Sequence, residues 1–194
     1  MSYFVTGATG FIGRYLVEEL LDHREGDIHV LVREGSLPRL QRMIERWQTS
    51  RVKPVVGDLG ADLLGVDGEW IAQHRDSVDH VFHLAAIYDM TADDATNEAL
   101  NVEGTKQALA LAAALDAGCF HQVSSVAAAG DFRGHFDESM FAEGQHLPSP
   151  YHRTKYDMDG GYRLVAPHRH GRDRAAHLTR AWTSTGPRRN PVTR

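Results

Sequence analysis

Apolar runs along the chain alternate with segments of helical periodicity. Runs of about four to eight apolar residues are typical of buried strands, whereas apolar residues three or four positions apart mark one face of a helix. The pattern predicts strands at 4–5, 28–32, 52–56, 78–84 and 119–124, and helices at 11–21, 37–47 and 92–117. Strands that alternate with helices indicate βαβ units. Because such crossovers are almost always right-handed, we expect an α/β fold with a doubly wound parallel sheet.

The composition is that of an ordinary globular protein, with 42% hydrophobic and 24% charged residues among 194. A chain of this length can form one domain with a sizeable core. No apolar run approaches the roughly 20 residues that a membrane span needs, and the N-terminus lacks the basic segment of a signal peptide. Cys119 is the only cysteine, so no internal disulfide can form. We therefore expect a cytoplasmic protein without a membrane span.

Charge is distributed unevenly along the chain, whose net charge is −5. Residues 160–194 contain eight arginines, no lysine and one acid, a net +7 that leaves −12 on the other residues. A basic tail can signal nucleic-acid binding, but this segment is poor in apolar runs and has the composition of a disordered tail. Its histidines, His168, His170 and His177, lack the spacing of metal ligands. We predict neither a nucleic-acid partner nor a metal site.

Three glycines follow the first strand, at positions 7, 10 and 13. A glycine-rich loop that leaves a strand and opens a helix is the usual binding site for a dinucleotide pyrophosphate. Gly7 permits the tight turn, Gly10 keeps a Cβ away from the pyrophosphate, and Gly13 lets the helix pack closely. The helix N-terminus offers unpaired N–H groups to the phosphates. The loop predicts a dinucleotide site, and an ordinary glycine-rich turn is the alternative.

The residue after the second strand bears on which dinucleotide binds. In this fold the end of that strand reaches the adenosine ribose, where an acid favours NAD and an arginine suits the 2′-phosphate of NADP. Arg33 stands there, and its forked guanidinium matches a phosphate group. Glu34 follows directly and favours the opposite choice. We predict NADP as the cofactor, with NAD as the alternative.

Tyr151 and Lys155 are spaced so that both lie on one face of a helix. The Lys ammonium favours the phenolate form of a nearby Tyr. The Tyr can then exchange a proton with a carbonyl or alcohol oxygen while hydride moves to or from a nicotinamide. This spacing is common, and it gains weight here because five strands that begin with a dinucleotide loop precede it.

Together these motifs resemble the extended branch of the short-chain dehydrogenase/reductases, the NAD-dependent epimerase/dehydratase superfamily. The resemblance covers residues 1–159 and rests on the string TGATGFIG at 6–13 and on Tyr151 and Lys155. The segment 123–130 looks most like the fatty-acyl and thioester reductases. Epimerases usually carry a tyrosine where Ala129 stands, and dehydratases an Asp-Glu pair at 126–127. The resemblance implies a Rossmann fold and a small-molecule substrate.

The resemblance also implies roles for individual residues. In the family, a serine or threonine at the position of Ser125 hydrogen-bonds the substrate oxygen, with Ser124 as the second choice here. The asparagine at the position of Asn101 supports the active site. Asp58 and Leu59 would lie beside the adenine. The candidate catalytic residues are Ser125, Tyr151, Lys155 and Asn101. The candidate cofactor-binding residues are Gly7, Thr9, Gly10, Phe11, Ile12, Gly13, Arg33, Asp58, Leu59, Ala85, Ala86, Tyr151 and Lys155.

The resemblance stops after Lys155. Gly160 and Gly161 should end the helix about one turn later, because two glycines cost roughly 2 kcal/mol relative to alanines inside a helix. No sixth strand or substrate-binding region is recognisable beyond them. We therefore expect an NAD(P)-binding domain with its catalytic Ser, Tyr and Lys over 1–159, truncated after the fifth strand and catalytic helix. Residues 160–194 would be a disordered basic tail, either native or the out-of-frame product of a GC-rich gene. The helix forms the dimer in relatives, so a dimer is not favoured here.

Three functions remain open at this point. The leading hypothesis is an NADPH-dependent oxidoreductase that reduces a carbonyl or an acyl thioester by hydride transfer. A sugar-nucleotide epimerase or dehydratase with tightly held NAD is the second. The third is a fragment or regulator that binds nucleotide without turnover. A short catalytic helix and a missing substrate region predict little or no turnover, because misplacement by about 1 Å can cost on the order of 100-fold in rate.

Overall fold

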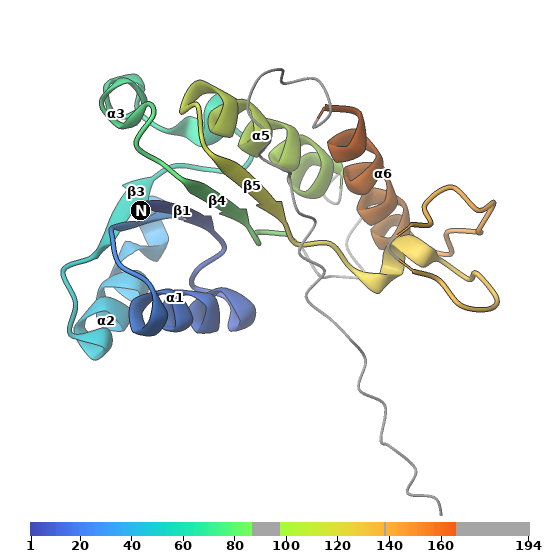
Figure 1. The fold of residues 1–194 in the computed structure, drawn as a ribbon, viewed down its shortest axis with the longest axis horizontal. Helices are drawn as coiled ribbons and strands as arrows, with labels where there is room; N and C mark the ends of the chain where they lie inside the picture. Colours follow the sequence, from blue (N-terminus) through green and yellow to red (C-terminus); the bar gives the residue numbers. More distant parts are fainter. Residues whose placement is uncertain (87–97, 138, 166–194) are drawn as a thin grey trace, which may run out of the picture.

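A computed structural model describes residues 1–86, 98–137 and 139–165. Five parallel strands form one sheet in the order β3-β2-β1-β4-β5 (Figure 1). The strands are β1 (Tyr3–Thr6), β2 (Ile28–Val32), β3 (Val52–Val56), β4 (His80–His83) and β5 (Cys119–Gln122). This order and the uniformly parallel pairing confirm the predicted doubly wound Rossmann fold.

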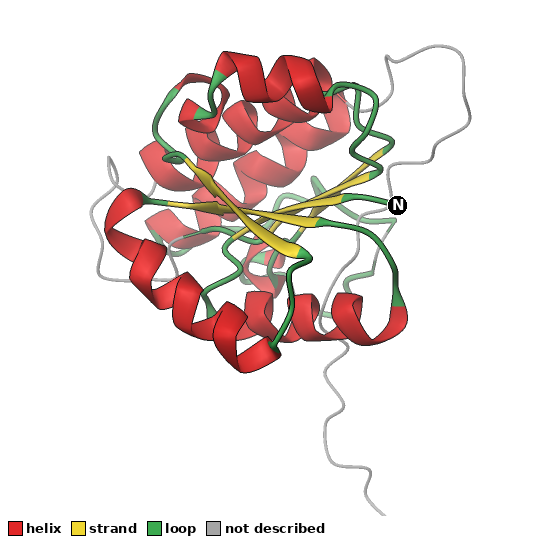
Figure 2. Ribbon diagram, turned by 90° about the vertical axis from the view of Figure 1, so that its left-hand side faces the viewer, coloured by secondary structure: helices red, strands yellow, loops and turns green. Residues whose placement is uncertain are grey.

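Helices cover both faces of the sheet (Figure 2). The helices α1 (Phe11–His23) and α2 (Leu37–Trp47) lie on one side, and α3 (Gly68–His74), α5 (Gly104–Ala114) and α6 (Pro150–Val165) lie on the other. Each side has its own apolar cluster. The cluster beneath α1 and α2 includes Tyr3, Val5, Val17, Val30 and Leu40. The cluster beneath α3 and α5 includes Phe4, Val81, Leu111, Leu115 and Phe120.

Four short helical turns connect the longer elements. They are the 3-10 helices η1 (Glu34–Ser36), η2 (Asp62–Gly65) and η4 (Val126–Ala129) and the π-helix η3 (Glu98–Glu103). Sequence patterns did not predict η1, η2 or η4, whereas η3 falls within the helix predicted over 92–117, and they also missed α3. Helix α3 has only seven residues, which is too short for a clear period, and the side chain of Asp67 caps it by accepting from the N–H groups of Glu69 and Trp70.

The long helix predicted over 92–117 is shorter at its C-terminal end. Residues 92–97 lie outside the described residues, and the remainder consists of η3 followed by α5, which ends at Ala114. Asp116 adopts a left-handed conformation with φ of 50°. The N–H of Ala117 then bonds back to the carbonyl of Ala112 at 2.9 Å, which closes the helix.

The predicted end of the catalytic helix shortly after Lys155 is wrong. Helix α6 continues through Gly160 and Gly161 to Val165, so the expected boundary at 159/160 falls inside it. Glycine propensity is a weak preference that packing overrides. Helix α6 packs against η3 and η4. In the part of the helix whose side chains are described, 150–159, the buried residues are Tyr151, Thr154, Lys155, Met158 and Asp159. The rest of the predicted tail, 166–194, lies outside the described residues. Within the described part of the chain, no helix is long and apolar enough to cross a membrane.

Candidate active site

The carboxyl ends of parallel strands meet at one edge of a sheet, and the predicted site residues follow those ends. Gly7 follows β1, Arg33 follows β2, and the segments at 57–59, 84–86 and 123–125 follow β3, β4 and β5. The strand order changes direction between β1 and β4. A dinucleotide binds at such a switch point in open α/β sheets. The structure therefore brings the predicted cofactor and catalytic positions to the edge where this fold binds its ligands.

Two of the three loop glycines are required by the packing of the loop itself. Gly7 has φ of 75°, and a Cβ there would lie 2.8 Å from the amide nitrogen of Ala85. A Cβ on Gly13 would overlap the carbonyl group of Gly7. Gly10 is instead exposed at the start of α1, where its N–H bonds to the carbonyl of Gly7 at 3.0 Å. Gly7 and Gly13 hold the turn together, and Gly10 presents bare backbone to solvent.

The N-terminus of α1 has the features of an anion site. No side chain caps it, and its first turn contains no acidic residue. Phe11 and Ile12, the first residues of the helix, are 73% and 50% exposed. Exposed apolar side chains beside uncapped N–H groups suit a ligand that combines phosphates with planar rings.

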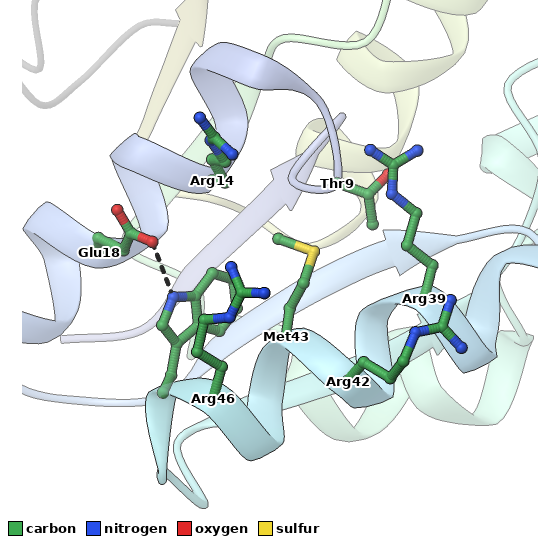
Figure 3. Close-up of a pocket in the computed structure, with 8 residues that line it drawn as sticks. Thr9, Arg14, Glu18, Arg39, Arg42, Met43 and Arg46 are labelled. Carbon is green, nitrogen blue, oxygen red and sulfur yellow. Dashed lines mark hydrogen bonds between the residues drawn. The ribbon is translucent and has the colours of Figure 1, made fainter.

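A pocket of about 260 Å³ lies between α1 and α2, next to the glycine loop. Figure 3 shows that the guanidinium of Arg39 lies near Thr9 of the loop, and that Arg14 lies across the pocket on α1. The residues that line the pocket are Thr9, Arg14, Glu18, Arg39, Arg42, Met43, Arg46 and Trp47. Arg33, the predicted phosphate ligand, is exposed at the start of η1 and does not line this pocket.

Sequence reasoning missed the arginines of α2. Arg39, Arg42 and Arg46 recur at intervals of three and four residues, which places them on one face of the helix. That spacing was visible in the sequence, but only the structure shows that this face turns toward the glycine loop.

Tyr151 and Lys155 are both buried near the start of α6, with exposures of 5% and 3%. The Lys155 nitrogen lies 5.8 Å from the centroid of the Tyr151 ring. Burial lowers the pKa of the Lys155 ammonium to about 8, and the carboxylate of Asp159 partly opposes this effect. The pair is thus held together inside the protein, and the pKa of its lysine lies well below the ordinary value.

The two candidate serines have different partners. Ser124 donates its hydroxyl proton to a carboxylate oxygen of Asp159 at 2.8 Å. Ser125 accepts a hydrogen bond from the N–H of Ala127 at 3.2 Å and so caps η4. Ser125 lies between the end of β5 and the start of η4. Because η4 packs against α6, Ser125 is on the side of the sheet edge that carries the helix of Tyr151.

A buried histidine connects the ends of β1 and β4 to α5. The Thr105 hydroxyl donates to the carbonyl of Asn101 at 2.7 Å, so it accepts from Nε2 of His83 at 3.2 Å. Nδ1 of His83 must then accept from the Thr6 hydroxyl at 2.8 Å, and the Thr6 oxygen accepts from the N–H of Ala85 at 3.2 Å. This direction of donation fixes the neutral Nε2–H tautomer. Burial, and to a smaller extent the charge of Lys155, lowers the pKa of His83 to about 3.

Asn101 continues this chain of hydrogen bonds to the catalytic helix. Its side-chain amide donates to the Thr154 hydroxyl over 3.4 Å, and Thr154 donates to the carbonyl of Tyr151 at 3.1 Å. We call the five side chains of Thr6, His83, Asn101, Thr105 and Thr154 the His83 network; each is at most 6% exposed. Sequence reasoning gave a site role to Asn101 but none to the side chains of the four others, whose contacts join residues far apart in the chain.

The remaining predicted cofactor residues follow the carboxyl ends of β3 and β4. Asp58 is exposed, and its carboxylate accepts from the N–H of Gly60 at 2.9 Å. Leu59 packs against the cluster beneath α3 and α5. Ala85 is half-buried and Ala86 is exposed.

The chain is similar to several known proteins. A family model described as "Male sterility protein" matches residues 5–177. The chain is 32% identical over 154 residues to a linear gramicidin synthase from Brevibacillus parabrevis, covering 74% of this chain and 3% of the synthase. It is 29% identical over 177 residues to an aldehyde reductase from Aspergillus flavus, covering 82% of this chain and 16% of that protein.

A solved structure is also similar. The terminal R domain from the myxalamid PKS-NRPS biosynthetic pathway has a TM-score of 0.75 and 26% sequence identity, covering 85% of this chain and 46% of that chain. The chain thus spans less than half of the structure and less than a fifth of the two curated relatives.

Proposed function

Because the chain belongs to the Male sterility protein family of NAD(P)-binding domains, within the extended short-chain dehydrogenase/reductases, we propose that it is an NADPH-dependent reductase of a carbonyl or acyl thioester. The observation that supports this most is the buried pair of Tyr151 and Lys155 at the same sheet edge as the glycine loop. We propose one domain that runs through α6 to Val165, and the cytoplasm as its compartment.

A nicotinamide bound at this edge of the sheet would supply the hydride for reduction of the carbonyl. Tyr151 gives its phenolic proton to the oxygen, and the Lys155 ammonium stabilises the phenolate that remains. Ser125 holds the substrate oxygen, because a hydroxyl that accepts from the N–H of Ala127 still has its own proton to donate. Ser124 is the weaker candidate because its proton is given to Asp159. Gly7, Gly10, Gly13 and the uncapped start of α1 would hold the pyrophosphate.

Reduction is favoured over the two alternatives by separate observations. The relatives named as an aldehyde reductase and as an R domain support a carbonyl or acyl thioester substrate. An epimerase or dehydratase is disfavoured by Ala129 and by Val126 and Ala127, where those enzymes usually carry Tyr and Asp-Glu. A binding module without turnover has no need of a buried lysine beside a buried tyrosine, since burying a charge is costly.

The continuation of α6 changes the expected activity. One of the two reasons for expecting little or no turnover was a catalytic helix that ended one turn after Lys155, and that helix extends to Val165. Tyr151 and Lys155 are therefore held by a helix of 16 residues. We propose that the chain turns over small aldehydes, although slowly compared with the usual enzyme range of about 1–1000 per second.

The arginine pocket supports NADPH over NADH. Arg39 faces Thr9 of the glycine loop, and Arg42 and Arg14 line the same pocket. Three guanidinium groups beside a pyrophosphate site match the additional phosphate on the adenosine ribose of NADP. We propose that Arg39 and Arg42 bind this phosphate together with Arg33, the residue that the sequence indicated.

We predict that the double variant Arg39→Gln/Arg42→Gln loses at least about tenfold in NADPH affinity and little in NADH affinity. Charge-assisted hydrogen bonds to a phosphate contribute roughly 1.5–3 kcal/mol each, and only NADPH carries the phosphate concerned. Titration of both cofactors by fluorescence measures the two dissociation constants.

Two further variants test the cofactor site and the specificity of the arginine effect. Gly10→Val should lose both cofactors, because a branched side chain would stand where the pyrophosphate meets the backbone. Arg75→Gln removes an arginine that does not line the pocket and should bind both cofactors like the wild type. Equal affinity of the wild type for NADH and NADPH would contradict the proposed preference, and unaltered binding in Gly10→Val would contradict the proposed site.

We predict that the rate of carbonyl reduction falls as the pH rises through about 8. Lys155 is charged below its pKa of about 8 and neutral above it, and a neutral amine cannot stabilise the Tyr151 phenolate left after proton donation. The measurement is NADPH oxidation with an aldehyde between about pH 6 and about pH 10.

Lys155→Arg is the matched variant for this profile, since a guanidinium stays charged at every pH used. Its rate should show no fall near pH 8, whatever its absolute level. A wild-type profile that is flat across pH 8, or one that persists unchanged in Lys155→Arg, would show that Lys155 does not control the reaction.

A further inference from the structure

Three metal-binding side chains meet at the edge of the sheet opposite the candidate active site. His80 begins β4 and Cys119 begins β5, and the sheet register pairs these two residues directly. His121 follows Cys119 by two positions, so its side chain lies on the same face of the sheet. Tyr3 pairs with His80 and shares that face, which is the one that carries α1 and α2.

The side chains of this cluster are close enough to share one ion. Nδ1 of His80 lies 3.0 Å from Nε2 of His121. One potential ligand atom from each of the three residues lies within 4.8 Å of the other two, and all three residues are half-buried. Around a tetrahedral zinc ion, with Zn–N of about 2.0–2.1 Å and Zn–S of about 2.3 Å, such atoms are separated by roughly 3.3–3.6 Å. Shifts of about 1 Å would bring the three donors to that geometry.

Packing already fixes the two imidazole rings. The ring of His121 stacks on Phe82 with centroids 4.3 Å apart and planes 9° apart. The ring of His80 stacks on Tyr3 at 5.8 Å and 12°. Rings that are ordered before an ion arrives lose little conformational entropy when they bind it.

We propose that His80, Cys119 and His121 form a binding site for Zn²⁺. Two imidazoles and one thiolate are donors that zinc prefers, and water would complete the tetrahedron. Binding releases the thiol proton of Cys119 to solvent and replaces the contact between the two imidazoles. The ion would tie the edge strand β5 to β4 at the end of the sheet that the cofactor does not use. Sequence spacing could not reveal this site, because the sheet register brings its ligands together.

The test uses Co²⁺ as a spectroscopic probe on the metal-free full chain under reducing conditions. A thiolate that binds Co²⁺ gives a near-ultraviolet charge-transfer band. Since Cys119 is the only cysteine in the chain, the band reports this residue and no histidine elsewhere. We expect a band that saturates at one equivalent of Co²⁺ and disappears when Zn²⁺ is added.

Three variants decide the result. The near-isosteric Cys119→Ser should lose the band while keeping its circular dichroism spectrum and its NADPH affinity. His121→Asn should bind Co²⁺ at least tenfold more weakly, and His23→Asn, an exposed histidine of α1, should bind like the wild type. The absence of a thiolate band in the wild type would overturn the proposal, and so would an equal affinity in His121→Asn. Neither result depends on whether the protein is a reductase.

Discussion

Replacing Tyr151 by phenylalanine should lower NADPH-dependent carbonyl reduction by about 100- to 10,000-fold, the usual contribution of a positioned general acid. The phenol is the group that we propose donates the proton, and the substitution removes only its oxygen. The ring of Tyr151 stays buried against its neighbours, so the helix should keep its place. NADPH affinity should therefore change by less than about threefold, because a group used only in the transition state affects rate rather than binding.

Tyr156→Phe is the matched control for this experiment. Tyr156 lies on the same helix, and its ring stacks on Phe141 at 4.4 Å and 9°. Its hydroxyl has no role in the proposed reaction, so this variant should react at the wild-type rate. Equal rates in the wild type and in Tyr151→Phe would exclude Tyr151 as the acid. A wild type that binds NADPH but never exceeds the protein-free rate would favour the binding module over the reductase.

The elements that the sequence predicted well are those with a local signal. The boundaries of β2, β3 and α2 match the apolar pattern residue for residue. The run of β2 marks a strand that is buried on both faces, whereas β3 ends the described sheet and buries only Val52 and Val55 of its run. The amphipathic face of α2 repeats at helical spacing. The sequence also predicted the glycine loop. Position 7 has a positive φ and a close backbone contact, and both of these favour glycine there.

The features that the sequence did not reveal depend on contacts between distant segments. The helix α6 continues through Gly160 and Gly161 because its buried face packs on η3 and η4, which propensity does not include. The pocket between α1 and α2 collects its arginines only once both helices pack on the sheet. The role of His83 is invisible in the sequence, since its partners Thr6 and Thr105 are 77 and 22 positions away.

The His83 network supports a second prediction of large effect. His83→Leu should reduce the free energy of unfolding by about 2–6 kcal/mol at neutral pH. The substitution leaves the Thr6 and Thr105 hydroxyls buried without their imidazole partner, and each such group costs about 1–3 kcal/mol. His83→Gln should recover more than half of the loss, because its amide oxygen can accept from Thr6 while its amide nitrogen donates to Thr105. Chemical denaturation of the three proteins measures these differences.

Acid sensitivity distinguishes a hydrogen-bonded neutral imidazole from a histidine that merely fills space. The pKa of His83 is lowered to about 3 in the folded protein, from 6.5 when the side chain is exposed. Below pH 6.5, the imidazole therefore binds a proton in the unfolded chain and stays neutral in the folded chain. The stability contributed by His83 is thus complete above pH 6.5 and is lost as the pH falls toward 3, by up to about 1.4 kcal/mol per pH unit.

His29, whose pKa burial lowers to about 4, adds a loss of the same sign that remains in every variant. Glutamine does not titrate, so His83→Gln takes up close to one proton fewer than the wild type on unfolding between about pH 6 and about pH 4. Its unfolding free energy should therefore fall less steeply with decreasing pH than that of the wild type. Parallel slopes in the two proteins would mean that His83 takes up its proton as readily in the folded state as in the unfolded state, and the neutral tautomer deduced from Thr6 and Thr105 would be wrong.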